Sequence, residues 1–197
     1  GFFASPAQGV GMAWEAGPSW RFSVAGGVDT RQRLAKDDGR LKGWRDVKAS
    51  PALLMTAQHS NGPFSASARW VTRLAREGER QQGGAWTMQF ETAYGLALDE
   101  TSSLQAGYAL TLMNARFAQT FFAVEQGLAQ RSGLALHRAG AGIMSHSVFL
   151  QWQMGRGDGW HMLARTELES LTGQAGRSPL VRRRLQPSVL VAVTRPF

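Results

Sequence analysis

Histidine and serine are the residues of this chain best suited to nucleophilic chemistry, and they occur side by side at two places. His59 precedes Ser60, and His146 lies between Ser145 and Ser147. A serine nucleophile requires a base and an orienting group within hydrogen-bond reach. Successive side chains of a β-strand point to opposite faces, so these adjacent residues cannot form a dyad within an extended segment. The sequence therefore predicts no catalytic residues.

Metal and cofactor sites are not indicated either. The chain contains no cysteine, which excludes disulfides and thiolate ligands, and the four histidines show no zinc-binding spacing. Gly83-Gly84 and Gly155-Arg156-Gly157 are typical of turns rather than of phosphate-binding loops. Asp37-Asp38-Gly39 favours a turn, with a cation site as the weaker interpretation. We expect no metal and no cofactor.

The elements that would position these residues are strands, because apolar and polar residues alternate along most of the chain. Trp20, Phe22 and Val24 share one face of a segment, whereas Arg21 and Ser23 share the other. The pattern predicts about ten strands in an all-β, antiparallel fold. No window holds the ~18 apolar residues that a spanning helix needs. The alternation is irregular in two segments, residues 51–59 and 143–153.

The joins between these segments are alternately short and long. The short joins fall at residues 16–18, 60–63, 99–101 and 155–159, and the long ones at 30–48, 75–84, 114–141 and 171–186. Outer-membrane barrels combine short periplasmic turns with longer outer loops. The chain is therefore predicted to be an up-and-down transmembrane β-barrel of a Gram-negative outer membrane. A soluble sheet protein is the alternative, and the 114–141 join is expected either as a plug or on the rim.

Aromatic residues gather near both ends of the predicted apolar faces. Amphipathic aromatic rings favour the headgroup level of a bilayer. The predicted interfacial girdle comprises Trp14, Trp20, Trp70, Trp86, Tyr94, Trp152 and Trp160.

Charged residues of both signs fall on the opposite, non-apolar faces. Inside a narrow barrel they would converge and pair, whereas in a soluble sheet they would form a solvated face. The predicted lumen polar cluster comprises Glu15, Arg21, Arg69, Glu91, Arg165 and Glu167.

The chain has a net charge of +8 and a pI of about 11.1, a balance that raises nucleic acid as a partner. Its basic residues, however, concentrate in the long joins, above all in residues 31–48 and 177–184. A solvated loop is the favoured interpretation of these runs, and contact with the phosphates of lipopolysaccharide is the alternative. For the protein as a whole we expect membrane lipids and lipopolysaccharide as partners, and no nucleic acid.

At 197 residues the chain is expected to form one domain, residues 1–197. It begins with GFFAS, as if within a domain, and we expect it to lack N-terminal strands.

Several stretches resemble the MipA/OmpV family of outer-membrane proteins. They are GFFAS at 1–5, LKGWRDVKASP at 41–51, NARFAQTFFAV at 114–124, AQRSGL at 129–134, AGAG at 139–142 and SPLV at 178–181. The motif positions are Ser50, Pro51, Ser178, Pro179, Leu180 and Val181. The resemblance runs from the first residue to the last.

The resemblance implies a barrel of about twelve strands in a complete member. It also implies a non-catalytic scaffold that links a murein hydrolase (a periplasmic transglycosylase) to a murein synthase (a penicillin-binding protein). The C-terminal aromatic Phe197 is the expected assembly signal. The family usually ends in tyrosine–arginine–phenylalanine, whereas this chain ends Thr194-Arg195-Pro196-Phe197, and proline removes a donor from the strand.

Two other functions remain as alternatives. A small porin-like or adhesin barrel is the first, although about sixteen strands are typical of an open aqueous channel. A lipid-modifying hydrolase of the outer membrane is the less favoured second, with His146 as its best candidate because it falls near the outer end of a strand.

Overall fold

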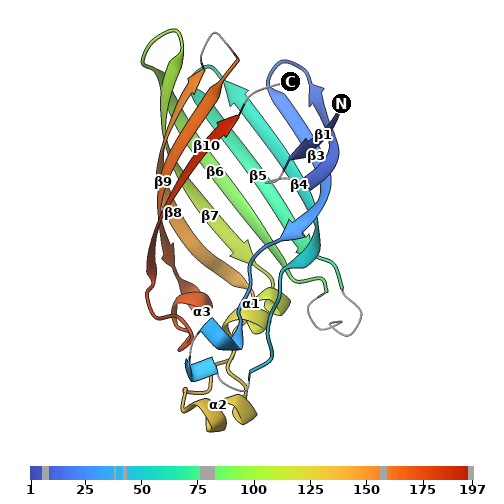
Figure 1. Cartoon of the computed structure of the whole chain (residues 1–197), viewed down its shortest axis with the longest axis vertical. Helices are drawn as coiled ribbons and strands as arrows, with labels where there is room; N and C mark the ends of the chain where they lie inside the picture. Colours follow the sequence, from blue (N-terminus) through green and yellow to red (C-terminus); the bar gives the residue numbers. More distant parts are fainter. Residues whose placement is uncertain (6–8, 38, 42–43, 76–82, 156–158, 195–197) are drawn as a thin grey trace.

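The computed structural model describes all residues of the chain except 6–8, 38, 42–43, 76–82, 156–158 and 195–197. One antiparallel sheet dominates it, with ten strands paired in the order of the sequence, and the sheet curves into a barrel-like wall (Figure 1). The strands are β1 (Phe2–Ser5), β2 (Gly9–Ala16), β3 (Trp20–Asp29), β4 (Ser50–Asn61), β5 (Phe64–Arg73), β6 (Trp86–Ala97), β7 (Ser102–Met113), β8 (Gly142–Gly155), β9 (His161–Leu171) and β10 (Leu185–Thr194). The predicted all-β, up-and-down fold is confirmed.

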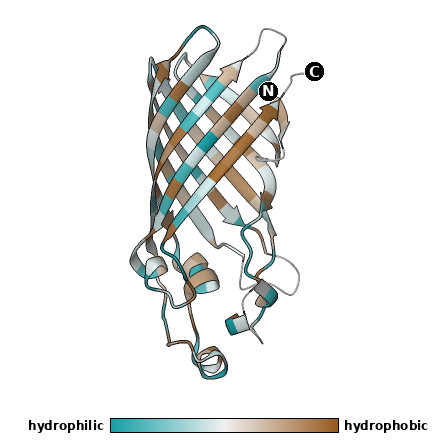
Figure 2. Cartoon of the chain, turned by 60° about the vertical axis from the view of Figure 1, so that its left-hand side comes forward, coloured by the Kyte–Doolittle hydropathy of each residue, from teal (hydrophilic) through white to brown (hydrophobic). Residues whose placement is uncertain are grey.

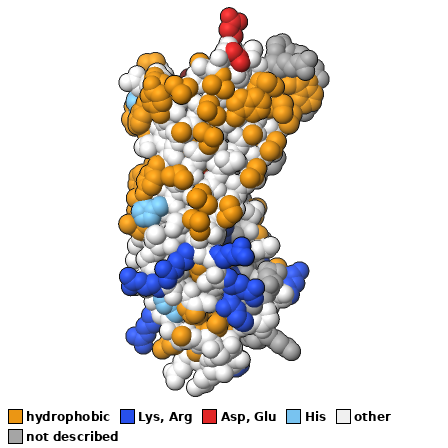
Figure 3. Space-filling view, turned by 90° about the vertical axis from the view of Figure 1, so that its left-hand side faces the viewer, with side chains coloured by type: hydrophobic (Ala, Val, Ile, Leu, Met, Phe, Trp, Pro, Cys, Tyr) orange, Lys and Arg blue, Asp and Glu red, His pale blue; other side chains and the backbone are white. Residues whose placement is uncertain are grey.

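Every long strand presents one face to the inside of the wall and one to the outside. Val24 of β3 lies opposite Met12 of β2 and Met55 of β4, so apolar side chains form rows on the outer face. Ser23 pairs with Thr56 on the inner face. Figure 2 shows the resulting alternation along the strands, and Figure 3 shows apolar side chains over the outer wall. Exposed apolar surface of this extent is typical of a wall in contact with lipid or protein.

The connections follow the predicted alternation of short and long joins. Short turns join β2 to β3, β4 to β5, β6 to β7 and β8 to β9, and we call this edge of the sheet the short-turn end. At Gly62 the backbone φ is +56°, a left-handed conformation that glycine adopts without steric cost. The described residues of the long joins at 30–48, 114–141 and 171–186 lie at the opposite end of the strands.

The two segments with irregular alternation are also strands, β4 and β8. In the β7–β8 ladder the register shifts between Thr111 and Leu112, which pair with Ser145 and Ile143. Met144 is therefore the extra residue of a bulge, which moves the side chains that precede it to the other face. This explains why the first part of β8 breaks the period of two.

The long joins fold together at their end of the sheet into what we call the loop cap: residues 30–49, 114–141 and 172–184. It contains α1 (Ala115–Phe122), α2 (Gln126–Ser132), α3 (Gly173–Gly176) and two short 3-10 helices, η1 (Ala35–Asp37) and η2 (Gly39–Leu41). No helix of the described residues is long and apolar enough to cross a membrane. The 114–141 segment lies beyond the strands, so it occupies the rim rather than the interior.

An apolar core holds the loop cap against the strands. Phe117 and Ala118 of α1 pack with Met113 at the end of β7 and with Ala175 of α3. Phe117 is 2% exposed and stacks on Phe121 with 4.5 Å between ring centroids. Burial against other segments stabilises this helix of eight residues, which would be marginal alone.

Candidate functional site

Three of the six predicted lumen residues meet in one ion-pair cluster inside the sheet. Arg165 of β9 makes a forked contact with Glu91 of β6, with Nη2–Oε2 and Nη1–Oε1 distances of 2.9 and 3.3 Å. Its Nε donates to Glu167 Oε2 at 3.1 Å. The inward period of two places these side chains on the same face, and the curvature of the sheet brings β6 and β9 within reach of each other. One guanidinium thus pairs with two carboxylates, and the three ionised groups together carry a net charge of −1.

An aromatic ring packs against this cluster. The Arg165 guanidinium lies 3.6 Å from the ring centroid of Phe149 in β8, a cation–π contact. Phe149 in turn covers Gly107 of β7, where a Cβ added to the glycine would fall 2.2 Å from the ring. Gln151 adds hydrogen bonds to Arg165 and Gln105. The cluster fills the interior at this level with fixed, paired groups.

The other three predicted lumen residues lie apart from that cluster. Glu15 and Arg21 face each other across the β2–β3 pair near the short-turn end, where both are exposed. Arg69 lies in β5, with Thr56 and Gln89 as its neighbours across the ladders. The structure thus brings Glu91, Arg165 and Glu167 together, whereas Glu15 and Arg21 lie near the short-turn end and Arg69 lies beside Gln89 on the strand next to β6.

The serine and histidine pairs do not form a nucleophilic site. Ser145 and Ser147 are buried on the inner face, whereas His146 projects outward and its Nδ1 hydrogen-bonds the Tyr108 hydroxyl. His59 also lies on the outer face, where its ring is 4.7 Å from that of Trp20. Opposite orientations along a strand separate each hydroxyl from its neighbouring imidazole. Among the described residues, no group of three or more His, Cys, Asp or Glu could hold a metal ion.

The seven residues of the predicted girdle occupy the outer face near the two ends of the strands. Trp14 pairs with Phe22 across β2 and β3, and Trp20 begins β3 at the short-turn end. Trp86 begins β6 at the loop end, close to Trp70, which pairs with Met88. Tyr94, Trp152 and Trp160 lie toward the short-turn end. Their interfacial role stays a prediction.

Both serine–proline motifs make hydrogen bonds at the loop end of the sheet. Ser50 opens β4, is 1% exposed, and donates through Oγ to the Leu74 carbonyl at 3.1 Å. Pro51 accepts a hydrogen bond from Leu74 N at 2.8 Å. These contacts join the start of β4 to the end of β5, so the first motif holds the two strands together at the loop end of the sheet.

The second motif ties the segment before β10 to α1. Ser178 Oγ donates to the Phe122 carbonyl at 2.6 Å and accepts from Leu180 N at 3.3 Å. Pro179 accepts from Arg40 Nη1 at 3.3 Å, and Val181 N donates to the Ser178 carbonyl. The motif therefore connects three of the loop-cap segments. Phe197 lies outside the described residues.

Comparison with protein families gives one match that extends over this whole arrangement. The family model described as MltA-interacting protein MipA matches residues 1–197. The chain belongs to the MipA family. No curated protein matches it significantly. Family and fold together indicate an outer-membrane protein.

Buried charges connect the loop end of the sheet to the loop cap in this MipA-family chain. Asp29 ends β3 and pairs with Arg31 at 2.8 Å and with Arg73 at 3.8 Å. The Arg73 side chain is 1% exposed and also donates to the carbonyls of Lys48 and Arg31. Thr87 accepts from Arg31 at 3.1 Å. The bridging segments are distant in sequence, so no local pattern reveals the network.

A carboxylate organises the β6–β7 turn at the short-turn end of this family member. Asp99 accepts hydrogen bonds from the hydroxyl and backbone N–H of Ser102, at 2.6 and 2.8 Å, and from those of Thr101, at 2.8 and 2.7 Å. These bonds, led by that of the Ser102 hydroxyl, favour the ionised form and lower the pKa of Asp99 to about 2. Asp99 is a turn residue, and these partners include no histidine that could act as a base.

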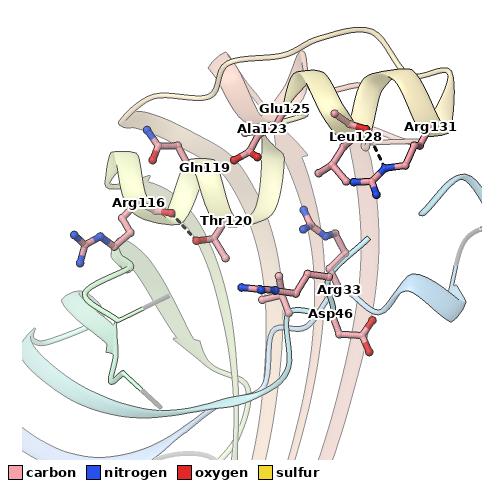
Figure 4. Close-up of a pocket in the computed structure, with 12 residues that line it drawn as sticks. Arg33, Asp46, Arg116, Gln119, Thr120, Ala123, Glu125, Leu128 and Arg131 are labelled. Carbon is pink, nitrogen blue, oxygen red and sulfur yellow. Dashed lines mark hydrogen bonds between the residues drawn. The ribbon is translucent and has the colours of Figure 1, made fainter. Parts of the chain in front are cut away.

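Sequence reasoning also missed a basic cavity in the loop cap, with a volume of about 670 Å³. One wall comes from the 30–49 segment of the loop cap, which contains Arg33 and Asp46 and which we call the strap. The other wall comes from α1, α2 and the residues between them (Figure 4). Four arginines contribute to the lining: Arg33, Arg45, Arg116 and Arg131. The basic run at 31–48 was visible in the sequence, but its placement against α1 and α2 depends on the tertiary fold.

Proposed function

We propose that this chain is an outer-membrane scaffold that holds a murein transglycosylase of the MltA kind beside a penicillin-binding murein synthase. The observation that carries the proposal is the match of the MipA family model to residues 1–197. The ion-paired interior and the opposite orientation of Ser145 and His146 favour binding over turnover.

In this proposal the short-turn end faces the periplasm and provides the contact with the murein enzymes. Outer-membrane barrels place short turns on that side. The turns around Pro18, Gly62 and Glu100 offer a small surface, in which Glu100 is exposed and acidic. Specific stable interfaces bury about 1,200–2,000 Å² in total. We therefore expect weak contacts with each enzyme, strengthened when both are bound.

The loop cap then faces outward, where lipopolysaccharide and other lipids are the proposed partners. Exposed arginines gather at this end: Arg131, Arg138, Arg177, Arg182, Arg183 and Arg184. Figure 3 shows basic side chains around the loop end and acidic ones at the short-turn end. Guanidinium groups bind phosphate by paired hydrogen bonds, which suits the phosphates of an outer leaflet.

Binding of the transglycosylase is the direct test. The purified protein in detergent micelles is titrated with a purified MltA-type transglycosylase, and binding is measured by biolayer interferometry. Pro18→Arg combined with Glu100→Lys at the short-turn end is expected to weaken binding. Arg177→Glu combined with Arg183→Glu is the matched control at the loop end and is expected to leave binding unchanged.

The outcomes separate the parts of the proposal. Absence of saturable binding would contradict the scaffold role. Loss of binding in the loop-end variant alone would reverse the proposed orientation. Addition of a purified bifunctional penicillin-binding protein is expected to give a three-component complex by size-exclusion chromatography only when the barrel is present; the same complex without the barrel would remove the need for a scaffold.

A further inference from the structure

The basic cavity of the loop cap is lined by more cationic than anionic side chains. Its lining also includes polar groups that can bind hydroxyls. Arginines contribute four positive charges, and Asp46 and Glu125 contribute two negative ones. Asp46 is engaged already, because its Oδ1 accepts from Ala35 N at 2.7 Å. The lining therefore has an excess of two positive charges.

Arg33 is the most strongly positioned of these cations. Its backbone pairs with Val47 in both directions, at 2.8 Å, and its guanidinium lies 4.9 Å from the ring centroid of the buried Trp44. Nη1 donates to the Phe121 carbonyl at 3.4 Å. Nε is buried and has no hydrogen-bond partner among the described residues. The side chain is thus fixed by packing while one donor stays unsatisfied.

Burial also changes the electrostatics of Arg33. Desolvation lowers the pKa of its guanidinium from the ordinary value, yet an arginine stays charged at neutral pH. A cation with reduced hydration attracts an anion more strongly than a fully solvated one. A buried donor without a partner requires an explanation, and an acceptor from a bound anion is one that fits the other arginines of this cavity.

The other arginines approach the same cavity from two helices and the strap. Arg131 of α2 donates from Nε to the Gly127 carbonyl at 3.0 Å, and Arg116 of α1 donates from Nη1 to the Gly83 carbonyl at 2.5 Å. Arg45 is exposed at the edge of the cavity. These contacts use one nitrogen of each of the two guanidinium groups, so the other nitrogens can donate hydrogen bonds to a ligand.

The remaining lining suits a sugar rather than a bare anion. Gln119, Thr120 and Glu125 provide amide, hydroxyl and carboxylate groups that exchange hydrogen bonds with hydroxyls, and Leu128 and Ala123 provide apolar contact. Figure 4 shows Gln119 and Thr120 on α1, Leu128 on α2, and Ala123 and Glu125 between the two helices; Arg33 and Asp46 come from the 30–49 segment. A cavity of about 670 Å³ is within the usual range for a small-molecule site.

We propose that this cavity binds a phosphorylated saccharide, with the arginines on the phosphate and the α1–α2 face on the sugar hydroxyls. The phosphorylated sugars of lipopolysaccharide and free sugar phosphates share this chemistry. The ligand class follows from the cavity alone; only the lipopolysaccharide source rests on the proposed outward orientation of the loop cap.

Calorimetric titration of the full chain in detergent tests the site, with glucose 1-phosphate as the probe and glucose and inorganic phosphate as reference ligands. We expect saturable binding of glucose 1-phosphate that is tighter than that of either reference. Arg45→Gln combined with Arg131→Gln changes exposed side chains and is expected to weaken binding about tenfold or more, as for lost charge-assisted hydrogen bonds. Arg177→Gln, an exposed loop-cap arginine outside the cavity, is the matched control and should change nothing.

Three results would overturn the proposal. One is the absence of saturable binding, and another is equal weakening by Arg177→Gln, which would indicate general surface charge. The third is equal affinity for inorganic phosphate and glucose 1-phosphate, which would show that the sugar does not contribute to binding. Competition by native but not dephosphorylated lipopolysaccharide would assign the source to the membrane, and competition by neither would assign it to free sugar phosphates. Transglycosylase binding at the short-turn end does not enter this measurement, so the two proposals fail independently.

Discussion

At the short-turn end, Asp99 secures the β6–β7 turn through bonds to residues two and three positions further along the chain. At the loop end, Phe117 packs with residues from β7, α3 and the segment before β6. The β6–β7 turn thus depends on local hydrogen bonds and the loop cap on contacts between distant segments. This turn can therefore form with its own hairpin, whereas the loop cap requires the sheet to bring its segments together first.

Removal of the central ring of the loop cap should have the largest effect. Phe117→Ala is expected to destabilise the loop cap by about 3–5 kcal/mol, the usual cost of a buried phenylalanine truncated to alanine. Hydrogen exchange of α1 and the 41–50 segment in lipid vesicles would measure the loss of protection. Phe64→Ala, at an exposed ring of the short-turn end, is the control and should leave the loop cap protected. Equal protection in both variants would contradict a loop cap held by Phe117.

A change in the wall between the two ends should have the next largest effect. Gly107→Val would force a side chain into Phe149 and the Thr92 carbonyl, and overpacking of this kind costs about 1–3 kcal/mol. Urea unfolding in vesicles, followed by tryptophan fluorescence, would measure it. Gly26→Val is the matched strand control, because a Cβ added at Gly26 would meet nothing within 4 Å. A smaller effect at Gly107 than at Gly26 would show that the interior is not packed at this level.

The junction of the loop cap and the wall should respond to loss of a helix cap. Asn114 Oδ1 accepts from Phe117 N at 2.8 Å and from Trp86 N at 3.1 Å, and its Nδ2 donates to the Gly84 carbonyl at 2.8 Å. Asn114→Ala is expected to cost about 0.5–2 kcal/mol, as for other N-caps. Asn114→Asp keeps the acceptor and loses the donor, so its loss of stability, by the same urea assay, should be smaller. An equal loss would assign the stabilisation to the Gly84 bond.

The smallest expected effect is a dependence on pH at the short-turn end. Because the folded pKa of Asp99 lies at about 2, below its ordinary value near 3.8, the contribution of the ionised carboxylate is fully present above pH 4 and is lost as pH falls through 2. NMR titration of the Asp99 carboxyl carbon would measure this pKa directly. Ser102→Ala should raise the pKa toward the ordinary value. An apparent pKa near 4 in the unchanged protein would contradict the hydrogen-bonded turn.

Sequence periodicity was sufficient for the strands and for the difference between their two faces. The shared outward direction of Trp20, Phe22 and Val24 follows from a period of two, and the lengths of the joins indicated which end of the sheet would carry the loops. The irregular start of β8 could not be resolved, because a bulge at Met144 is defined by pairing with β7. The lumen cluster was predicted only in part. A period of two places Glu91 and Arg165 on the inner face but does not determine where along the barrel axis each residue lies.

By itself, the sequence determined an antiparallel all-β chain, the inward or outward direction of its side chains and the family to which it belongs. These properties depend on residues close together in the chain or on short motifs in order. The tertiary structure alone decided that Arg165 meets Glu91, that Ser178 anchors α1, and that Arg33 and Arg131 line one cavity. Such contacts depend on the curvature of the sheet and the return path of the long joins, which bring together residues that no local spacing relates.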